Sequence, residues 1–251
     1  MPDITSFRVK IFADGANRAS ILELAGNPWI RGFTTNPTLM RQAGVADYEA
    51  FGKSLAHAIP ERPFSFEVLS DDFEEMERQA LRIAAWGENV YVKIPITDTR
   101  GRSSAGLVKR LAEQGVKINV TALMTLEQVD AVVPALRHGP PSCISIFAGR
   151  VADTGRDPLP ILCAALERIR AYPRIELIWA SPRELFNIVQ ADAIGCHIIT
   201  VTHDLLRKLS LLDRDLDEYS LDTVKMFVND ARAANFTLEA PAPFDTVSSR
   251  G

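Results

Sequence analysis

The sequence predicts an α/β protein with the fold of a single-domain (β/α)8 barrel, or TIM barrel, followed by an extra C-terminal helix. Short apolar runs alternate with stretches of helical length along most of the chain. That order predicts parallel strands joined by crossover helices. The 251 residues also fit the roughly 250 that such a barrel needs. No linker or shift in composition marks a second domain, so we expect one domain over residues 1–251.

Apolar runs of strand length occur eight times. The expected strands are Val9–Ala13, Ile30–Thr34, Phe64–Val68, Val90–Ile94, Lys117–Val120, Cys143–Phe147, Ile175–Trp179 and His197–Val201. Eight units within about 200 residues favour a closed barrel over an open doubly wound sheet. An open sheet usually carries a Gly-rich turn after its first strand, whereas this chain reads Asp14-Gly15-Ala16-Asn17 there.

Amphipathic stretches separate these strands. In Phe73–Trp86 the apolar side chains recur at helical spacing on one face. The other expected helices are Ala105–Gln114, Leu126–Leu136, Leu159–Ala171 and Glu184–Ala191.

A last helix is expected near Leu221–Ala233, after the final strand. Val224, Phe227 and Val228 form an apolar stripe on it. This stripe packs either against its own barrel or on a neighbouring subunit, and we expect a homo-oligomer.

Composition excludes several classes of protein. A formal net charge of −4 leaves no basic footprint for nucleic acid or an anionic membrane. No apolar run of about 18 residues exists, and Met1–Lys10 lacks the apolar core of a signal peptide, so we expect a cytoplasmic protein. Cys143, Cys163 and Cys196 are expected to be buried free thiols. The four histidines show no metal-ligand spacing, so no metal is expected.

Polar residues gather at the carboxyl ends of the expected strands, where the active site of an α/β barrel lies. They are Asp14, Thr34, Asn36, Glu67, Lys93, Asn119, Thr121, Ser145, Arg150, Ser181 and Arg183. Only the eighth strand contributes none of them. A purely structural barrel would not need this concentration of polar groups at one end.

Lys93 lies inside the apolar run Tyr91-Val92-Lys93-Ile94-Pro95, where a charged ammonium is costly to bury. Desolvation lowers the pKa of a lysine, and a neutral amine can attack a carbonyl to form a Schiff base. The alternative is a strand-end lysine that reaches solvent or pairs with a carboxylate.

Two carboxylates accompany this lysine. Cleaving the C3–C4 bond of a ketose needs a base for the C4 hydroxyl proton, and we assign that role to Asp14. Glu67, with Thr121 beside it, is expected to hold the water involved in carbinolamine loss. Either carboxylate could instead be an ion-pair partner or a helix cap.

Arg150 and Arg183 follow the sixth and seventh strands, beside Ser145 and Ser181. Barrels often bind phosphate on their later strands, and an arginine fork donates two parallel hydrogen bonds to it. Ser181 followed by Pro182 also predicts the N-cap and first position of a helix.

At this point the motifs resemble the transaldolase family, specifically its shorter members related to fructose-6-phosphate aldolase. The matching segments are Phe12-Ala13-Asp14, Gly32-Phe33-Thr34-Thr35-Asn36-Pro37-Thr38-Leu39, Val92-Lys93-Ile94-Pro95, Ile118-Asn119-Val120-Thr121, Ile144-Ser145-Ile146-Phe147-Ala148-Gly149-Arg150-Val151 and Ala180-Ser181-Pro182-Arg183. They follow the family's order and cover most of the chain.

The resemblance implies a Schiff-base mechanism without metal or cofactor. Lys93 would form the Schiff base, Asp14 would be the acid/base, and Glu67 with Thr121 would hold the catalytic water. Thr34, Asn36 and Asn119 would line the sugar site, and Ser145, Arg150, Ser181 and Arg183 would surround the phosphate. The implied substrates are fructose 6-phosphate or sedoheptulose 7-phosphate and an aldose phosphate acceptor.

Two positions favour transfer over plain aldol cleavage. The aldolase relatives have glutamine in place of Glu67 and tyrosine in place of Phe147, and a tyrosine hydroxyl could protonate the intermediate and release free dihydroxyacetone. Departures at Ile146, Pro182 and Glu184 lie beside the expected phosphate and acceptor site. The alternatives are a lyase of the same mechanism and a barrel that binds a sugar phosphate without turnover.

Overall fold

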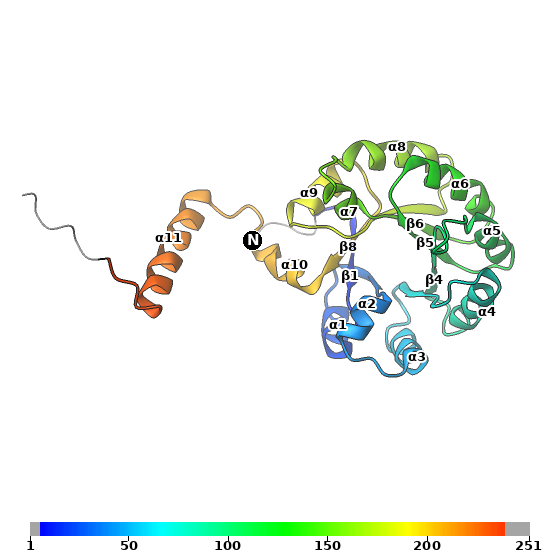
Figure 1. The fold of residues 1–251 in the computed structure, drawn as a ribbon, viewed down its shortest axis with the longest axis horizontal. Coiled ribbons are helices and arrows are strands. Elements are labelled where there is room, and N and C mark those ends of the chain that lie inside the picture. The colour runs from blue at the N-terminus through cyan, green and yellow to red at the C-terminus, as the bar shows by residue number, and fades with distance from the viewer. Residues whose placement is uncertain (1–5, 239–251) are drawn as a thin grey trace, which may run out of the picture. The chain divides into compact units, whose positions relative to one another are not determined.

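Eight parallel strands close into a barrel in chain order, and helices surround it (Figure 1). The computed structural model describes residues 6–238. The strands are β1 (Lys10–Asp14), β2 (Ile30–Thr34), β3 (Phe64–Glu67), β4 (Val90–Pro95), β5 (Ile118–Leu123), β6 (Ser142–Ile146), β7 (Ile175–Trp179) and β8 (Ile198–Thr202). The predicted (β/α)8 barrel is confirmed, and every expected strand overlaps an observed one.

The helices alternate with the strands, with several additional short ones. They are α1 (Arg18–Ala25), α2 (Pro37–Gln42), α3 (Tyr48–Ala58), α4 (Phe73–Ala84), α5 (Ala105–Glu113), α6 (Leu126–Leu136), α7 (Ala148–Ala152), α8 (Leu159–Ile169), α9 (Phe186–Ala193), α10 (His203–Arg207), the 3-10 helix η2 (Lys208–Leu211) and α11 (Leu216–Ala233). Sequence periodicity predicted α4, α5, α6 and α8 well, because each buries a stripe of apolar side chains.

Sequence periodicity did not predict α1, α2, α3, α7 and α10. Helix α1 buries only Ile21 and α2 buries only Met40, so neither has an apolar stripe to detect. Helix α3 is longer, but two of its three buried residues, Gly52 and Ala56, have little or no side chain. Side-chain caps from Asn17, Asn36 and Asp47 start α1, α2 and α3, whereas α7 and α10 have no side-chain cap and are only five residues long.

The predicted helix start at Ser181 was wrong. Helix α9 begins at Phe186, and Ser181 instead has a φ of 61°, in the left-handed region. The side-chain oxygen of Asn187 accepts the backbone N–H groups of Arg183 and Glu184, at 2.8 and 3.2 Å. Because the chain turns sharply at Ser181 and its next N–H groups are already bonded, the helix starts later than the Ser-Pro pair predicts.

Apolar side chains fill the layer between the strands and the outer helices. The rings of Phe33, Phe64 and Phe66 stack in series, with centroids 5.3 and 4.6 Å apart. Trp86 meets Phe66 edge-on at 5.2 Å. Inside the barrel a smaller apolar cluster forms around Phe12. Inside the barrel the apolar side chains thus lie mainly below the carboxyl ends of the strands, and polar side chains lie at those ends.

Two of the three cysteines are buried free thiols, as predicted, but Cys163 on α8 is exposed. The prediction failed there because apolar neighbours in sequence do not all face inward on a helix. Leu162 and Ala165 point to the barrel, whereas Cys163 lies on the outer side of the same turn.

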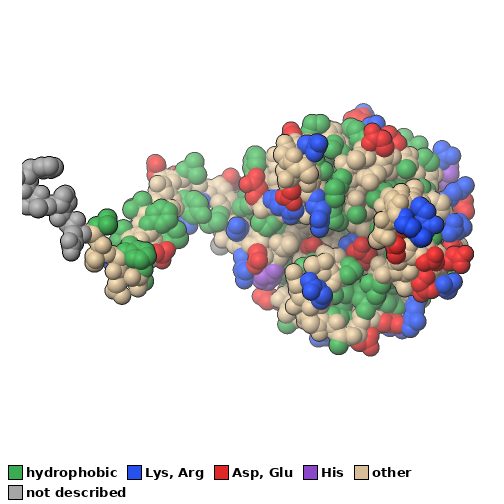
Figure 2. Space-filling view, in the orientation of Figure 1, with side chains coloured by type: hydrophobic (Ala, Val, Ile, Leu, Met, Phe, Trp, Pro, Cys, Tyr) green, Lys and Arg blue, Asp and Glu red, His purple; other side chains and the backbone are tan. Residues whose placement is uncertain are grey.

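The described residues divide into two compact units, one ending at Leu209 and the other starting at Ser210. Helix α11 of the second unit begins five residues before the predicted start, because Asp215 caps it by accepting the N–H of Glu218 at 2.9 Å. No residue of α11 is buried, and apolar side chains gather on it (Figure 2). The apolar stripe of α11 packs either against its own barrel or on a neighbouring subunit, and both alternatives stay predictions. The assignment of a single domain also stays a prediction. Across residues 6–238 the chain forms no helix long and apolar enough to span a bilayer.

Candidate active site

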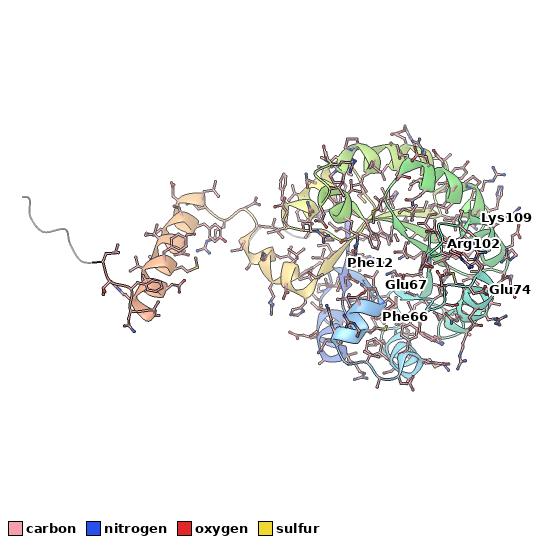
Figure 3. The ribbon with its side chains drawn as sticks, in the orientation of Figure 1. Phe12, Phe66, Glu67, Glu74, Arg102 and Lys109 are labelled. Carbon is pink, nitrogen blue, oxygen red and sulfur yellow. The ribbon has the colours of Figure 1, made fainter. Side chains whose placement is uncertain are left out.

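One pocket of about 150 Å³ lies at the carboxyl ends of the strands. Every predicted site residue except Glu67 lines it: Asp14, Thr34, Asn36, Lys93, Asn119, Thr121, Ser145, Phe147, Arg150, Ser181 and Arg183. Glu67 is the last residue of β3 and lies inside the ring of helices, whereas Glu74 and Lys109 lie on its outer surface (Figure 3). The barrel topology therefore brings together groups that are far apart in the sequence.

Lys93 is buried with 6% of its surface exposed. Its Nζ donates a hydrogen bond to the backbone oxygen of Thr35 at 2.9 Å and lies 3.2 Å from Oε2 of Glu67. Glu67 and Lys93 are register partners on β3 and β4, and this fixes their separation. The amine is therefore held by one carboxylate and one carbonyl, and Lys93 also lines the pocket.

Asp14 ends β1 and accepts a hydrogen bond from Thr34 Oγ1 at 2.7 Å. Burial raises the pKa of the Asp14 carboxyl above its ordinary value, although the nearby Lys93 and the Thr34 hydrogen bond oppose this. A carboxyl with a raised pKa exchanges protons nearer to neutral pH than an ordinary aspartate does. Asp14 therefore has the properties of an acid/base group.

Tyr48 supports Glu67 from outside the strand. Its hydroxyl donates to the backbone oxygen of Glu67 at 2.6 Å, and burial raises the pKa of this phenol. The phenol therefore stays protonated as a donor and fixes the end of β3. Tyr48 was not predicted from the sequence, because nothing in the sequence indicates that α3 delivers a hydroxyl to this strand.

A buried row of hydrogen bonds links β6, β5 and β3, and two of its members, Ser145 and Asn119, line the pocket. Ser145 Oγ donates to Asn119 Oδ1 at 2.7 Å, and Asn119 Nδ2 donates to Ser65 Oγ at 3.2 Å. An amide can make four hydrogen bonds, so this row uses only half of the capacity of Asn119. The two bonds fix the orientation of the Asn119 amide, and one donor and one acceptor site of this amide remain for a ligand.

Thr121 Oγ1 is buried and has no hydrogen-bond partner within the described part of the chain. Ala122, the next residue, has a φ of 64°, and the β5–β6 register shifts between Val120 and Leu123. Bulges of this kind re-aim side chains next to active sites. Thr121, with its unsatisfied hydroxyl, lines the pocket next to this irregularity.

Asn36 caps helix α2, because its Oδ1 accepts the N–H of Leu39 at 3.0 Å. This bond uses the amide oxygen and leaves the amide nitrogen as the donor for a ligand. Thr200 and Thr202 of β8 also line the pocket. These two threonines were not predicted, although their alternation along β8 places both side chains on the inner face.

Basic groups line the side of the pocket formed by β6 and β7. Arg150 on α7 has no hydrogen-bond or ion-pair partner within residues 6–238, and its guanidinium lies 5.9 Å from the Phe147 ring centre. Arg183 pairs with Asp153 and also donates to Ser181 Oγ at 3.0 Å. Asp153 was not predicted as part of the site, since no spacing rule links it to Arg183.

A larger cavity of about 500 Å³ lies at the opposite end of the barrel, around the amino-terminal ends of the strands. Lys10 and Glu176 in its wall neutralise each other, with Nζ 2.6 and 2.7 Å from the two carboxylate oxygens. This cavity is the larger of the two, and Arg31, Glu61 and Arg62 also line it. The buried lysine Lys93, however, lines the pocket at the carboxyl end, together with Asp14 and Arg150. No group of three or more His, Cys, Asp or Glu suited to hold a metal occurs in the described residues.

The fold and the site define a (β/α)8 barrel protein with a polar pocket that contains an amine, at the end where such barrels carry their active sites. Residues 11–242 match the model of the transaldolase/fructose-6-phosphate aldolase family, and the chain belongs to that family. The predicted resemblance is thus confirmed.

The curated relatives agree with this assignment. A "probable transaldolase" of Dehalococcoides mccartyi is 31% identical over 80% of this chain and 90% of its own length. Similarly described proteins of Methanococcus maripaludis and a Thermoanaerobacter species are 32% and 33% identical, over 85% of this chain and 97% and 96% of theirs. These similarities support an enzyme of this family.

Solved structures with low identity share the fold. KGPDC from Streptococcus mutans superimposes with a TM-score of 0.53 at 10% identity, over 77% of this chain and 88% of the other. Thiamine phosphate pyrophosphorylase from Pyrococcus furiosus gives 0.52 at 14% identity, over 78% and 86%. At such identities the likeness concerns the barrel alone.

Proposed function

We propose that this protein is a transaldolase that moves a dihydroxyacetone unit from a ketose phosphate to an aldose phosphate through a Schiff base on Lys93. The observation that carries the proposal is the setting of the Lys93 amine. It is buried in a polar pocket, 3.2 Å from Glu67 and within the electrostatic reach of Asp14. One amine with two carboxylates can divide nucleophilic attack and proton transfer among separate groups.

In the first half-reaction the neutral Lys93 amine attacks the C2 ketone and forms a carbinolamine. A proton delivered to its hydroxyl, which we assign to the water held by Glu67 and Thr121, lets this hydroxyl leave as water and gives the iminium, which accepts electrons. The same proton is released again when water adds to the iminium in the second half-reaction. Asp14 removes the C4 hydroxyl proton, the C3–C4 bond breaks, and its electron pair moves to C3 to form an enamine. The departing aldose phosphate carries a new C=O bond at the former C4.

In the second half-reaction these steps run backwards with another aldehyde. The enamine carbon attacks the acceptor, and protonated Asp14 returns its proton to the new hydroxyl. Water then adds to the iminium and releases the product ketose and the free amine. Glu67 and Thr121 are proposed to hold this water, which fits the buried Thr121 hydroxyl that lacks a protein partner.

The arginines support a phosphorylated substrate. Arg150 and Arg183 lie on the same side of the pocket, with the hydroxyls of Ser145 and Ser181 beside them. Arginine forks and hydroxyl donors suit phosphate oxygens. A phosphate bound there would place the sugar chain toward Lys93, which lines the same pocket. Asn36 and Asn119 would bind sugar hydroxyls through their unused amide groups.

Glu67 and Phe147 favour transfer over release of free dihydroxyacetone. Phenylalanine at position 147 has no hydroxyl to protonate the enamine, so the intermediate persists until an acceptor arrives. A carboxylate at position 67 also serves the water step by exchanging protons with it. A lyase of the same mechanism is the second candidate, and the product distribution separates the two.

Borohydride trapping tests the Schiff base. Incubation with fructose 6-phosphate and sodium borohydride is expected to leave a reduced three-carbon adduct on the peptide that contains Lys93, detected by mass spectrometry. Lys109, an exposed lysine on α5, is the internal control and should stay unmodified. If the protein binds fructose 6-phosphate but Lys93 acquires no adduct, the barrel binds sugar phosphate without this chemistry.

Product analysis tests transfer. With fructose 6-phosphate alone we expect little free dihydroxyacetone, whereas added erythrose 4-phosphate should yield sedoheptulose 7-phosphate and glyceraldehyde 3-phosphate. Equal release of dihydroxyacetone with and without the acceptor would identify a lyase instead.

A further inference from the structure

Arg183 does not stand free at the pocket, because a carboxylate occupies one edge of its guanidinium. Its Nε lies 2.9 Å from Asp153 Oδ1, and its Nη2 lies 2.5 Å from Asp153 Oδ2. This is the two-point geometry in which arginine and carboxylate are matched. The third nitrogen, Nη1, donates to Ser181 Oγ at 3.0 Å.

The hydrogen bonds leave a defined part of Arg183 for a ligand. A guanidinium has five N–H groups, and three of them are used on Asp153 and Ser181. The remaining two belong to Nη1 and Nη2, away from the carboxylate. The side chain therefore presents its outer nitrogens to a ligand, and it does so in one orientation.

Helix α7 holds Asp153 in this place. The backbone N–H of Asp153 donates to the backbone oxygen of Gly149 at 2.9 Å, so the two residues lie one turn apart on the same helix face. A side chain at position 149 would have its Cβ 1.7 Å from the oxygen of Ser181 and 3.2 Å from Cζ of Arg183. Glycine thus lets α7 lie directly against the Ser181–Arg183 segment and brings Asp153 to the guanidinium.

Both partners are charged in this contact. The hydrogen bonds from Arg183 hold the pKa of the Asp153 carboxyl below its ordinary value, and the same bonds raise the pKa of Arg183. The side chains remain about half exposed, at 52% and 46%. Exposed ion pairs contribute little to stability, so the pair has little value as a structural brace.

We propose that Asp153 is a positioning residue for phosphate recognition, which acts by locking Arg183 with its outer nitrogens toward the pocket. The inference rests on the proposed function, because it needs the phosphate of the substrate to bind beside Arg183. Asp153 also partly neutralises this side of the pocket, where Arg150 makes no hydrogen bond or ion pair within residues 6–238 but lies close enough to help lower the pKa of the Asp153 carboxyl.

Two effects of removing Asp153 oppose each other. Loss of its charge should favour anion binding, but water and salt screen that effect at half-exposed side chains. Loss of the lock frees a long side chain, and ordering it again on binding costs about 0.5–1.5 kcal/mol. We therefore expect Asp153→Asn to weaken phosphate binding about three- to tenfold.

The test measures the affinity of inorganic phosphate for the full-length protein by calorimetry, together with KM for fructose 6-phosphate and for unphosphorylated fructose. Asp153→Asn should weaken phosphate binding, raise KM for fructose 6-phosphate to a similar extent and leave fructose unchanged. Asp153→Glu keeps the charge and should recover part of the loss. Raising the salt concentration should weaken phosphate binding of both proteins without removing the difference between them.

A matched control comes from the outer helices. Asp130 on α6 pairs with Arg168 on α8 at 2.6 Å, with side chains exposed by 55% and 36%. Asp130→Asn removes a comparable ion pair away from the pocket. It should change the thermal unfolding midpoint about as little as Asp153→Asn does, and leave phosphate affinity unchanged.

A double variant tests whether Asp153 acts on phosphate binding through Arg183. If Asp153 acts through Arg183, then Asp153→Asn should have no further effect on phosphate affinity once Arg183→Ala is present. Tighter binding by Asp153→Asn, or an additive effect in the double variant, would overturn the proposal, as would a wild-type protein that does not bind phosphate. Failure of Lys93 trapping alone would remove the proposed reaction but leave this inference intact.

Discussion

The Nζ atom of Lys93 lies 3.2 Å from Oε2 of Glu67, and the two residues face each other in register on neighbouring strands. Parallel pairing between β3 and β4 fixes this contact, so it does not depend on a flexible loop. The backbone oxygen of Thr35 is a second partner, 2.9 Å from the same amine. The amine is thus oriented before any ligand arrives, which reduces the cost of reaching a reactive geometry.

Lys93→Ala should abolish the borohydride adduct and reduce transfer activity to background, because no other amine lines the pocket wall among the described residues. The variant should still fold, since β4 keeps its pairing with β3 and β5 and its buried apolar side chains Val92 and Ile94. Circular dichroism and mass spectrometry check both points. An adduct that persists at wild-type yield would show that another lysine carries the chemistry.

Asp14→Asn should lower kcat by about 10²- to 10⁴-fold, the usual contribution of an acid/base group. The yield of trapped Schiff base should fall much less than kcat, because the proton of the C4 hydroxyl is removed only after the iminium forms. Single-turnover kinetics separate these steps. Equal loss of trapping and turnover would instead assign Asp14 to carbinolamine formation.

The same variant has a predicted effect on stability. Burial raises the pKa of Asp14 in the folded protein, so folding favours its protonated form. This contribution is fully present below the unfolded-state pKa and is lost as pH rises through the raised folded-state pKa. Asp14→Asn should therefore be more stable than the wild type at pH 7, and the difference in unfolding midpoint should shrink as the pH falls. A difference that grows in acid would contradict the raised pKa.

Phe147→Tyr should shift the products from transfer toward free dihydroxyacetone. The new hydroxyl would lie in the pocket, where it can protonate the enamine before an acceptor binds. The ratio of released dihydroxyacetone to sedoheptulose 7-phosphate, measured at a fixed acceptor concentration, checks this. Phe147→Leu is the control, because it changes the ring without adding a proton donor and should not increase release.

Arg183→Ala should lower kcat/KM for phosphorylated donors roughly 30-fold. This corresponds to a loss of about 2 kcal/mol in transition-state binding, the scale of a hydrogen bond to a charged group. Unphosphorylated fructose should be affected much less. Steady-state kinetics with both sugars give the comparison. Similar losses for the two donors would remove Arg183 from phosphate binding.

Gly149→Ala should destabilise the protein by at least about 1–3 kcal/mol, the usual cost of overpacking, because its Cβ would lie 1.7 Å from the backbone oxygen of Ser181. Gly106→Ala in helix α5 is the matched control. Its Cβ would meet only the end of the Arg110 side chain at 4.0 Å, so it should stabilise by about 0.5–1 kcal/mol through helix propensity. Chemical denaturation of both variants measures the two effects.

The sequence alone determined the barrel and the identity of its chemical groups. Hydrophobic periodicity predicts the strands and helices that bury an apolar stripe, such as α6 over Leu126–Leu136. Closure of parallel strands then requires polar residues at their carboxyl ends to converge, which is why the sequence predicts that Lys93, Asp14 and Arg150 share one site.

Only the tertiary structure decided the partners of those groups. Tyr48 on Glu67 and Asp153 on Arg183 are contacts between segments with no fixed spacing in sequence. The left-handed turn at Ser181, and the later start of α9, depend on Asn187 and on the close approach of Gly149. Periodicity reports which side chains a segment buries locally, whereas these contacts arise from how separate loops pack against one another in three dimensions.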